Sequence, residues 1–176
     1  MIATIFLDSV LKRFAYYKAL GDQSIAVLTE EQLHWQPEGA PNSIYLIIKH
    51  MSGNMRSRWT DFLHSDGEKP WRDRDREFED DVASAAAVKA LWEEGWQCML
   101  EAIRALQPGD LEKTVYIRHE PHTVLDAINR QLAHIPYHVG QIVYIAKMIK
   151  KNDWESLSIP KGKSQAFNQD MFNKKQ

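Results

Sequence analysis

The sequence has very little cysteine: Cys98 is the only one among 176 residues. A single cysteine cannot form a disulfide within the chain, so the fold must be stabilised by burial of apolar side chains. Cys98 lies in an apolar helical segment, where a thiol usually fills space, whereas a reactive thiol needs an accessible, electropositive setting. We therefore interpret Cys98 as a packing residue.

Long apolar runs are also missing. No stretch approaches the roughly 20 apolar residues that a membrane-spanning helix requires. The amino-terminal segment MIATIFLDSVLKRF is interrupted by Asp8 and has no small-residue cleavage site after it. It is typical of an amphipathic helix rather than a signal peptide. We therefore expect a cytoplasmic protein with no membrane association.

Neither sign of charge dominates the chain. It has 22 Lys and Arg against 24 Asp and Glu, a formal net charge of −2. It also has no helix-turn-helix pattern, no basic stripe and no ladder of aromatic residues, so we expect no nucleic-acid partner.

Apolar residues recur at helical spacing in four long segments. Their approximate bounds are residues 2–28, residues 43–64, a third segment that ends near residue 106, and residues 123–151. The run TVYI at residues 114–117, with a turn near residues 120–121, predicts a short β-hairpin before the last helix. The sequence therefore predicts an all-α fold, a four-helix bundle, in a single domain over residues 1–176.

Two segments fall outside this helical pattern. Residues 66–81 are highly charged and predict a solvated connection, with docking to a partner as the alternative. After Asn152, Pro160 and Gly162 argue against a continuous helix, yet the segment is too apolar for a disordered tail. It predicts an irregular carboxy-terminal strap that packs across the bundle.

The last long helix is apolar on two sides. Tyr137, Tyr144 and Met148 lie opposite an aliphatic stripe, which comprises Ile128, Leu132, Ile135, Val139, Ile142 and Ala146. A helix of this kind is either central or partly buried in a subunit interface. With only four long helices available, we favour the interface and predict a homodimer.

Three histidines form the candidate metal site. His134 and His138 are four residues apart, which places both on one face of a helix, one turn apart. His50 is the best third ligand, because it lies in a helix that should face the core. Imidazole nitrogens bind zinc at about 2.0–2.1 Å, and bundles build metal sites from facing helices.

A pair of histidines at this spacing also occurs by chance in many helices, so its surroundings matter. Arg130 and Gln141 share a narrow arc with His134 and His138, and Asn54 lies on the same side of its helix as His50. Buried polar groups are costly unless something satisfies them. We therefore predict that Asn54, Arg130 and Gln141 support the metal or face the substrate.

Three neutral ligands leave a coordination position open, as in catalytic rather than structural zinc sites. Ile135 follows His134, so the HExxH pattern with its glutamate base is absent, which argues against a zincin-like protease. Three imidazoles suit zinc, nickel, copper and iron alike, so the ligands do not identify the metal. Pro136 either kinks the helix harmlessly or tunes the angle between the two histidines.

The other four histidines lack metal-ligand spacing and are expected to be solvated at the surface. His119, beside the predicted hairpin turn, could alternatively reach the mouth of the site. The remaining three are His34, His64 and His122.

The stretches IIKHMSGNM and HIPYHVGQIVYIAKMI resemble the DinB-like (YfiT-like) superfamily of metal-binding four-helix bundles. The second carries that superfamily's H-x3-H-x-G-Q pattern at His134, His138, Gly140 and Gln141. The blocks NSIYLIIKHMSGNMRSRWTDFLHSDGEKPWRDRDREFED and LSIPKGKSQAFN resemble one branch of uncharacterised bacterial proteins within it.

The resemblance implies an up-down-down-up bundle, often dimeric, with nickel, zinc or a similar ion held by three histidines. Relatives in the superfamily include enzymes that transfer bacillithiol or mycothiol onto electrophiles, and a mycothiol-dependent isomerase. The expected function is therefore a metal-dependent, bacillithiol-type S-transferase or related detoxification enzyme, in which Arg130 helps to position an anionic cofactor. The alternatives are a metal-dependent hydrolase, whose missing base would come from residues 66–81, and a non-catalytic, stress-associated binding module.

Overall fold

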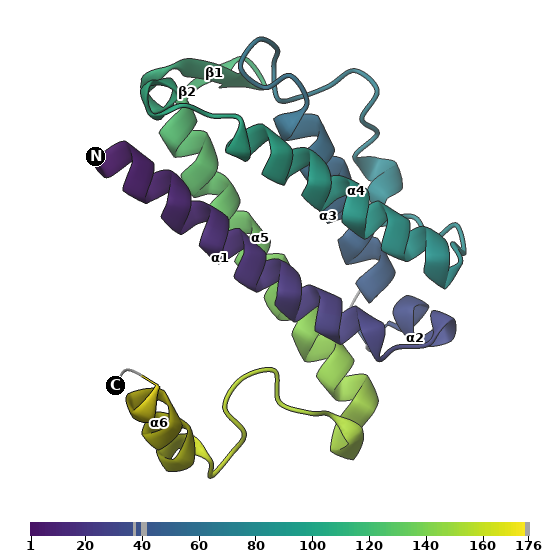
Figure 1. The fold of residues 1–176 in the computed structure, drawn as a ribbon. Helices are drawn as coiled ribbons and strands as arrows, with labels where there is room; N and C mark the ends of the chain where they lie inside the picture. Colours follow the sequence, from purple (N-terminus) through teal and green to yellow (C-terminus); the bar gives the residue numbers. More distant parts are fainter. Residues whose placement is uncertain (37, 40–41, 175–176) are drawn as a thin grey trace.

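The computed structural model describes residues 1–36, 38–39 and 42–174, and these contain six α-helices and one antiparallel β-hairpin (Figure 1). The predictions of a mostly helical fold and of a hairpin before the last long helix are confirmed. The α-helices are α1 (Ile2–Ala26), α2 (Glu30–His34), α3 (Ile44–Trp59), α4 (Ala85–Arg104), α5 (Val124–Lys150) and α6 (Ser164–Asn173). The strands are β1 (Thr114–Ile117) and β2 (Glu120–Thr123), and the 3-10 helices are η1 (Asp75–Phe78), η2 (Pro108–Glu112) and η3 (Lys151–Asp153).

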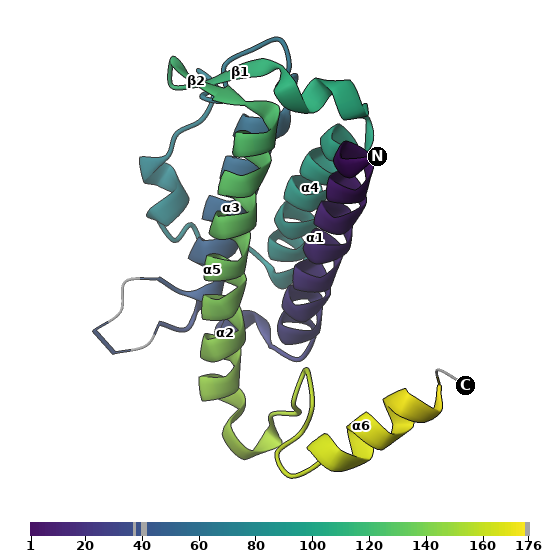
Figure 2. The same cartoon turned by 90° about the vertical axis from the view of Figure 1, so that its left-hand side faces the viewer.

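The four long helices lie side by side (Figures 1 and 2). The most extensive contacts are between α3 and α4 and between α1 and α5, and α3 also packs against α5. Following the chain in Figure 2, α1 and α5 run in one direction and α3 and α4 in the other. The helices α3 and α5, which carry the candidate metal ligands, therefore pack against each other and run in opposite directions.

Side-chain caps fix where three of these helices begin. Ser43, Ser84 and Thr123 each accept a hydrogen bond from a backbone N–H in the first turn of α3, α4 and α5, respectively. Such caps satisfy backbone donors that a helix leaves free at its start. The second long helix is shorter than predicted, because Thr60 is extended and Asp61 has φ of 47°, which ends α3 at Trp59.

The core lies between the long helices and is built from large apolar side chains. Phe14 of α1 meets Trp96 of α4 edge-on, with ring centroids 6.5 Å apart, and neither side chain is exposed. Gly95 allows α4 to approach α3 closely, since a Cβ there would lie 2.8 Å from the Cα of Ser52. No helix in the described part of the chain combines the length and apolar character needed to cross a membrane.

Asp66 connects the start of the charged segment to the hairpin. Its carboxylate accepts hydrogen bonds from the backbone N–H groups of Glu68, Arg118 and His119, at 2.7–2.8 Å. Burial acts to raise the pKa of Asp66, but these donors outweigh it and lower the pKa to about 2. The hairpin is thereby fixed above the ends of α3 and α5.

The two apolar sides of α5 have different environments. Ile128, Ile135, Val139, Ile142 and Ala146 are buried, as the predicted stripe requires, and Leu132 packs partly against the core. On the opposite side, Tyr137 is 63% exposed, Tyr144 65% and Met148 41%. That face is uncovered in the single chain, and the homodimer stays a prediction.

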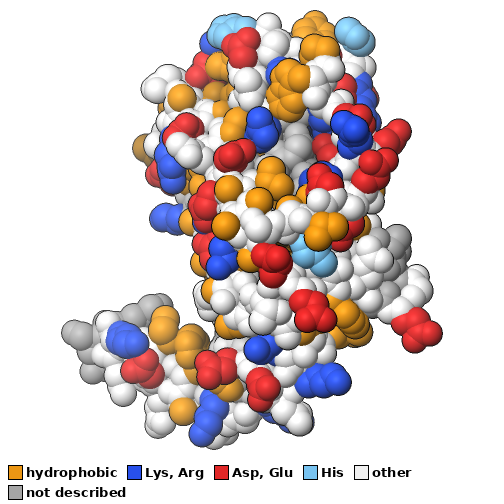
Figure 3. Space-filling view, turned by 90° about the vertical axis from the view of Figure 1, so that its right-hand side faces the viewer, with side chains coloured by type: hydrophobic (Ala, Val, Ile, Leu, Met, Phe, Trp, Pro, Cys, Tyr) orange, Lys and Arg blue, Asp and Glu red, His pale blue; other side chains and the backbone are white. Residues whose placement is uncertain are grey.

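The carboxy-terminal segment differs from the predicted irregular strap. Trp154 packs partly against the core, but residues 164–173 form α6, in which no residue is buried. Gly162, with φ of 81°, turns the chain before α6 and directs the helix away from the rest of the molecule (Figures 1 and 3). The apolar side chains of residues 164–173 provide enough helical periodicity for α6, but none of them is buried.

Candidate metal centre

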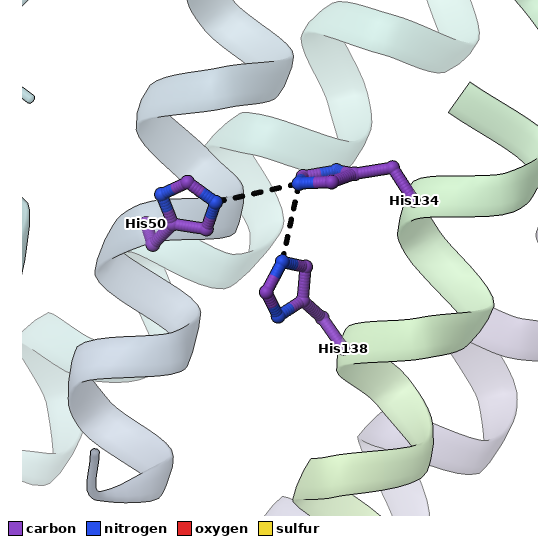
Figure 4. A group of neighbouring side chains, drawn as sticks. All are labelled: His50, His134 and His138. Atoms are coloured by element: carbon purple, nitrogen blue, oxygen red, sulfur yellow. Dashed lines mark hydrogen bonds between the residues drawn. The ribbon is translucent and has the colours of Figure 1, made fainter. Parts of the chain in front are cut away.

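Three histidine side chains converge between α3 and α5. Figure 4 shows His50 projecting from α3 toward His134 and His138, which lie one turn apart on α5. The Nε2 atom of His134 lies 3.3 Å from Nε2 of His50 and 3.1 Å from Nε2 of His138. The structure thus brings together all three residues that the sequence predicted as ligands, and they are close enough to hold one ion.

The spacing of these nitrogens fits a tetrahedral metal ion. Ligands at about 2.0–2.1 Å from such an ion lie roughly 3.3 Å from each other. The observed separations of 3.3 and 3.1 Å match that value. Two of the nitrogen–nitrogen distances therefore already have the length that a tetrahedral site requires.

Hydrogen bonds to the outer ring nitrogens leave the inner ones as acceptors. The Nδ1 atom of His50 donates to Glu77 at 2.8 Å, and that of His138 donates to the side-chain oxygen of Gln141 at 3.0 Å. A neutral imidazole carries one N–H, so Nε2 of both residues has only a lone pair. His134 can donate a single proton between them. The cluster therefore has an unmatched acceptor, which a cation would satisfy.

The two histidines of α5 are kept neutral by their surroundings. Burial lowers the pKa of His134, and the neighbouring His138, His50 and Arg72 add to the effect, which brings the pKa to about 3. Burial also lowers the pKa of His138, although the hydrogen bond to Gln141 acts against it. Metal ligation requires neutral imidazole, so both side chains are in the binding form at neutral pH.

Glu77 is a residue of the candidate site that the sequence did not reveal. Its side chain is 7% exposed, and its carboxylate accepts hydrogen bonds from His50 and from Arg72, whose Nε lies 2.7 Å from Oε1. Burial acts to raise the pKa of Glu77, but the hydrogen bonds from His50 and Arg72 outweigh it and lower the pKa. A carboxylate bound to the outer nitrogen of a metal ligand fixes its tautomer and increases its basicity.

The prediction that residues 66–81 form a solvated connection is therefore wrong for η1, which contains the buried Glu77. The 3-10 helix η1 lies against α3, Glu77 is buried, and the ring of Phe78 stacks on His50 with centroids 5.1 Å apart. The sequence feature connected with this packing is Gly53 of α3. The absence of a side chain at Gly53 makes room for Glu77, because a Cβ there would collide with Oε1 of Glu77.

The three predicted supporting residues have different positions. Gln141 contacts the candidate ligand His138 directly. Asn54 and Arg130 instead line a cavity of about 500 Å³ that His134 also lines, between α3, α5 and the hairpin. Pro136 lies inside α5, which continues through it, so both interpretations of this proline stay open.

The remaining histidines do not join the cluster. His34 is not simply solvated, since it bonds to Asp80 at 2.9 Å and to the backbone oxygen of Ala83. The side chain of His122 is 8% exposed and pairs with Asp126. His64 is exposed, as is the 99% exposed side chain of His119, which does not line the cavity within the described part of the chain.

Comparison with known proteins identifies the family. A family model described as "Protein of unknown function (DUF1572)" matches residues 1–163, which include every residue of the histidine cluster and its supporting contacts. A search of curated proteins finds no match to the chain. Because the family model covers all but the carboxy-terminal α6 region, the chain belongs to the DUF1572 family.

Proposed function

We propose that this protein is a metal-dependent S-transferase that joins a low-molecular-weight thiol of the bacillithiol type to an electrophile. The observation that carries the proposal is the convergence of three histidine nitrogens beside a cavity. Three ligands leave a position open for a substrate, as in catalytic metal sites. The sequence resemblance to the DinB-like superfamily, with its thiol transferases, supports the same choice.

The arrangement of the helices is consistent with this assignment. The directions of α1, α3, α4 and α5 follow the up-down-down-up order that the resemblance implies (Figure 2). We therefore infer a DinB-like four-helix bundle, with zinc or nickel as the ion. The exposed tyrosines of α5 favour a homodimer, and a cytoplasmic location remains the expectation from the sequence.

The residues of the site have three kinds of role: metal binding, orientation of the histidines and substrate binding. A divalent ion held by the three histidines would supply positive charge that favours the thiolate form of the bound thiol at neutral pH. Glu77 keeps the proton of His50 on Nδ1, and Gln141 does the same for His138. Arg130 adds a positive charge to the cavity wall, where an anionic part of a substrate can bind.

The test begins with metal content. Protein purified without an affinity tag or chelator should contain about one ion per chain by mass spectrometry, and His50→Ala and His134→Ala should lose it. Metal-loaded protein should then bind bacillithiol in a titration and conjugate it to a model electrophile. Stoichiometric metal with neither thiol binding nor conjugation would refute the transferase proposal while leaving the metal centre intact.

A metal-dependent hydrolase is less favoured on structural grounds. The base expected from residues 66–81 would have to be Glu77, which is the buried carboxylate of that segment nearest the histidines. Both of its oxygens are already engaged by His50 and Arg72, and its pKa is lowered, so it is a poor proton acceptor.

A further inference from the structure

The cavity beside His134 has features of its own that the metal does not explain. Its volume of about 500 Å³ is within the range of small-molecule sites. Much of its wall is apolar and is formed by Trp59 and Phe62 on one side and by Val115 and Ile117 of β1 on another. A ligand with an apolar body of moderate size would therefore replace water there favourably.

Two amide side chains of this wall lack hydrogen-bond partners. Gln131 is only 5% exposed and its Nε2 donor is unpaired within the described residues, as is the buried Oδ1 acceptor of Asn54. A buried polar group without a partner costs about 1–3 kcal/mol. The indole Nε1 donor of Trp59, in the same wall, is also unpaired within the described residues. The donor of Gln131 and the acceptor of Asn54 are complementary to a ligand that accepts one hydrogen bond and donates another, as a secondary amide does.

The charge of the cavity is positive. Arg58 and Arg130 line it, and no acidic side chain is among its lining residues in the described part of the chain. Arg58 is already engaged, since it donates to the backbone oxygen of Gly67 and to Glu68. Arg130 forms no ion pair with any described residue, so its guanidinium is available to an anionic group. A carboxylate matches the forked geometry of its donors.

We infer that this cavity binds an organic carboxylate whose apolar body is joined to the acid through an amide, the chemistry of an N-acyl amino acid. The apolar body packs against Trp59 and Phe62, the amide pairs with Gln131 and Asn54, and the carboxylate binds Arg130. The inference goes beyond the proposed function, because it names a ligand class for the cavity and assigns that ligand no chemical step. Binding itself depends on residues outside the histidine cluster.

The probe is hippurate, which combines a phenyl ring, a secondary amide and a carboxylate. Calorimetric titration of metal-free protein should show binding, with hippuramide at least tenfold weaker because it lacks the charge. The analogue 4-phenylbutyrate should also bind several-fold more weakly because it lacks the amide. Arg130→Gln should abolish the preference for hippurate over hippuramide, and Gln131→Leu should abolish the preference for hippurate over 4-phenylbutyrate.

The matched control is Arg104→Gln, an exposed arginine on α4 that should leave every affinity unchanged. Circular dichroism establishes that each variant is folded. Failure of hippurate to bind at millimolar concentration, or equal affinity for hippurate and hippuramide, would overturn the inference even if the protein binds metal and conjugates thiols. Selective binding of hippurate by a protein that binds no metal would support it and refute the proposed function alone.

Discussion

Glu77→Gln replaces a buried carboxylate with a neutral side chain of the same size, directly behind the candidate ligand His50. In the structure the carboxylate accepts from Nδ1 of His50 at 2.8 Å and from Arg72 at 2.7 and 3.0 Å. A glutamine has one oxygen to accept with, and its NH₂ group would face one of these donors. The substitution therefore breaks at least one charged hydrogen bond and leaves Arg72, whose side chain is 2% exposed, without its counter-ion.

Two magnitudes follow from this geometry. Loss of a hydrogen bond to the outer nitrogen of a metal-binding histidine weakens metal affinity about 10- to 100-fold, or about 1.4–2.7 kcal/mol. Removing one partner of a buried ion pair destabilises a protein by about 3–5 kcal/mol. We expect Glu77→Gln to show both effects, with the loss of stability present even without metal.

The assay is competition for zinc against a chromophoric chelator, together with urea unfolding of the metal-free protein. The control is Glu79→Gln, two residues away in the same segment, where the side chain is exposed. If folded Glu77→Gln binds zinc as tightly as Glu79→Gln, then Glu77 does not support the ligand and the reasoning is refuted.

Three further predictions concern stability and are each measured by urea unfolding. Gly53→Ala should lower the free energy of unfolding by about 1–3 kcal/mol, because its Cβ would collide with Glu77. Gly140→Ala, whose Cβ would have nothing within 4 Å, should raise the free energy of unfolding by up to about 1 kcal/mol. Equal effects of the two substitutions would contradict the close approach of Glu77 to Gly53. Asp66→Asn should cost about 1–2 kcal/mol at pH 7, less than the full pKa shift implies, because solvent screens this partly exposed carboxylate. The pKa of about 2 in the folded protein lies below the ordinary value of 3.8 for an aspartate. The difference in stability from wild type should therefore be full above pH 4 and vanish as the pH falls through 2. A difference that does not change with pH would count against the backbone donors. Truncation after residue 163 should change stability by less than about 0.5 kcal/mol, because α6 buries nothing; a larger loss would indicate that α6 packs on the protein.

The parts of the fold that could be predicted from sequence are those encoded by short repeats. The stripe on α5 that includes Ile135 and Val139 recurs at helical spacing, and the caps at Ser43 and Thr123 are local signals. The same periodicity places His134 and His138 on one face of α5. Each of these features depends on residues within a few positions of one another, so a single sequence is enough to find it.

The carboxy-terminal segment shows where that reasoning fails. Its apolar residues, such as Phe167 and Phe172, were expected to pack because apolar side chains usually do so. They are 45% and 69% exposed, respectively, in a helix that stands away from the other helices. Composition can indicate that a segment has apolar surface to bury, but it does not specify the surface that buries it.

Glu77 could not be predicted for a different physical reason. It reaches His50 across 27 residues, through a segment whose charges outnumber its apolar residues and whose only regular structure is the 3-10 helix η1. What places it is a set of tertiary contacts: the pair with Arg72, the stacking of Phe78 on His50, and the space left by Gly53. These contacts tie the orientation of a candidate metal ligand to the folding of the charged segment. Any ion that requires His50 in this orientation must then stabilise that segment as well, since binding to one conformation shifts the equilibrium toward it.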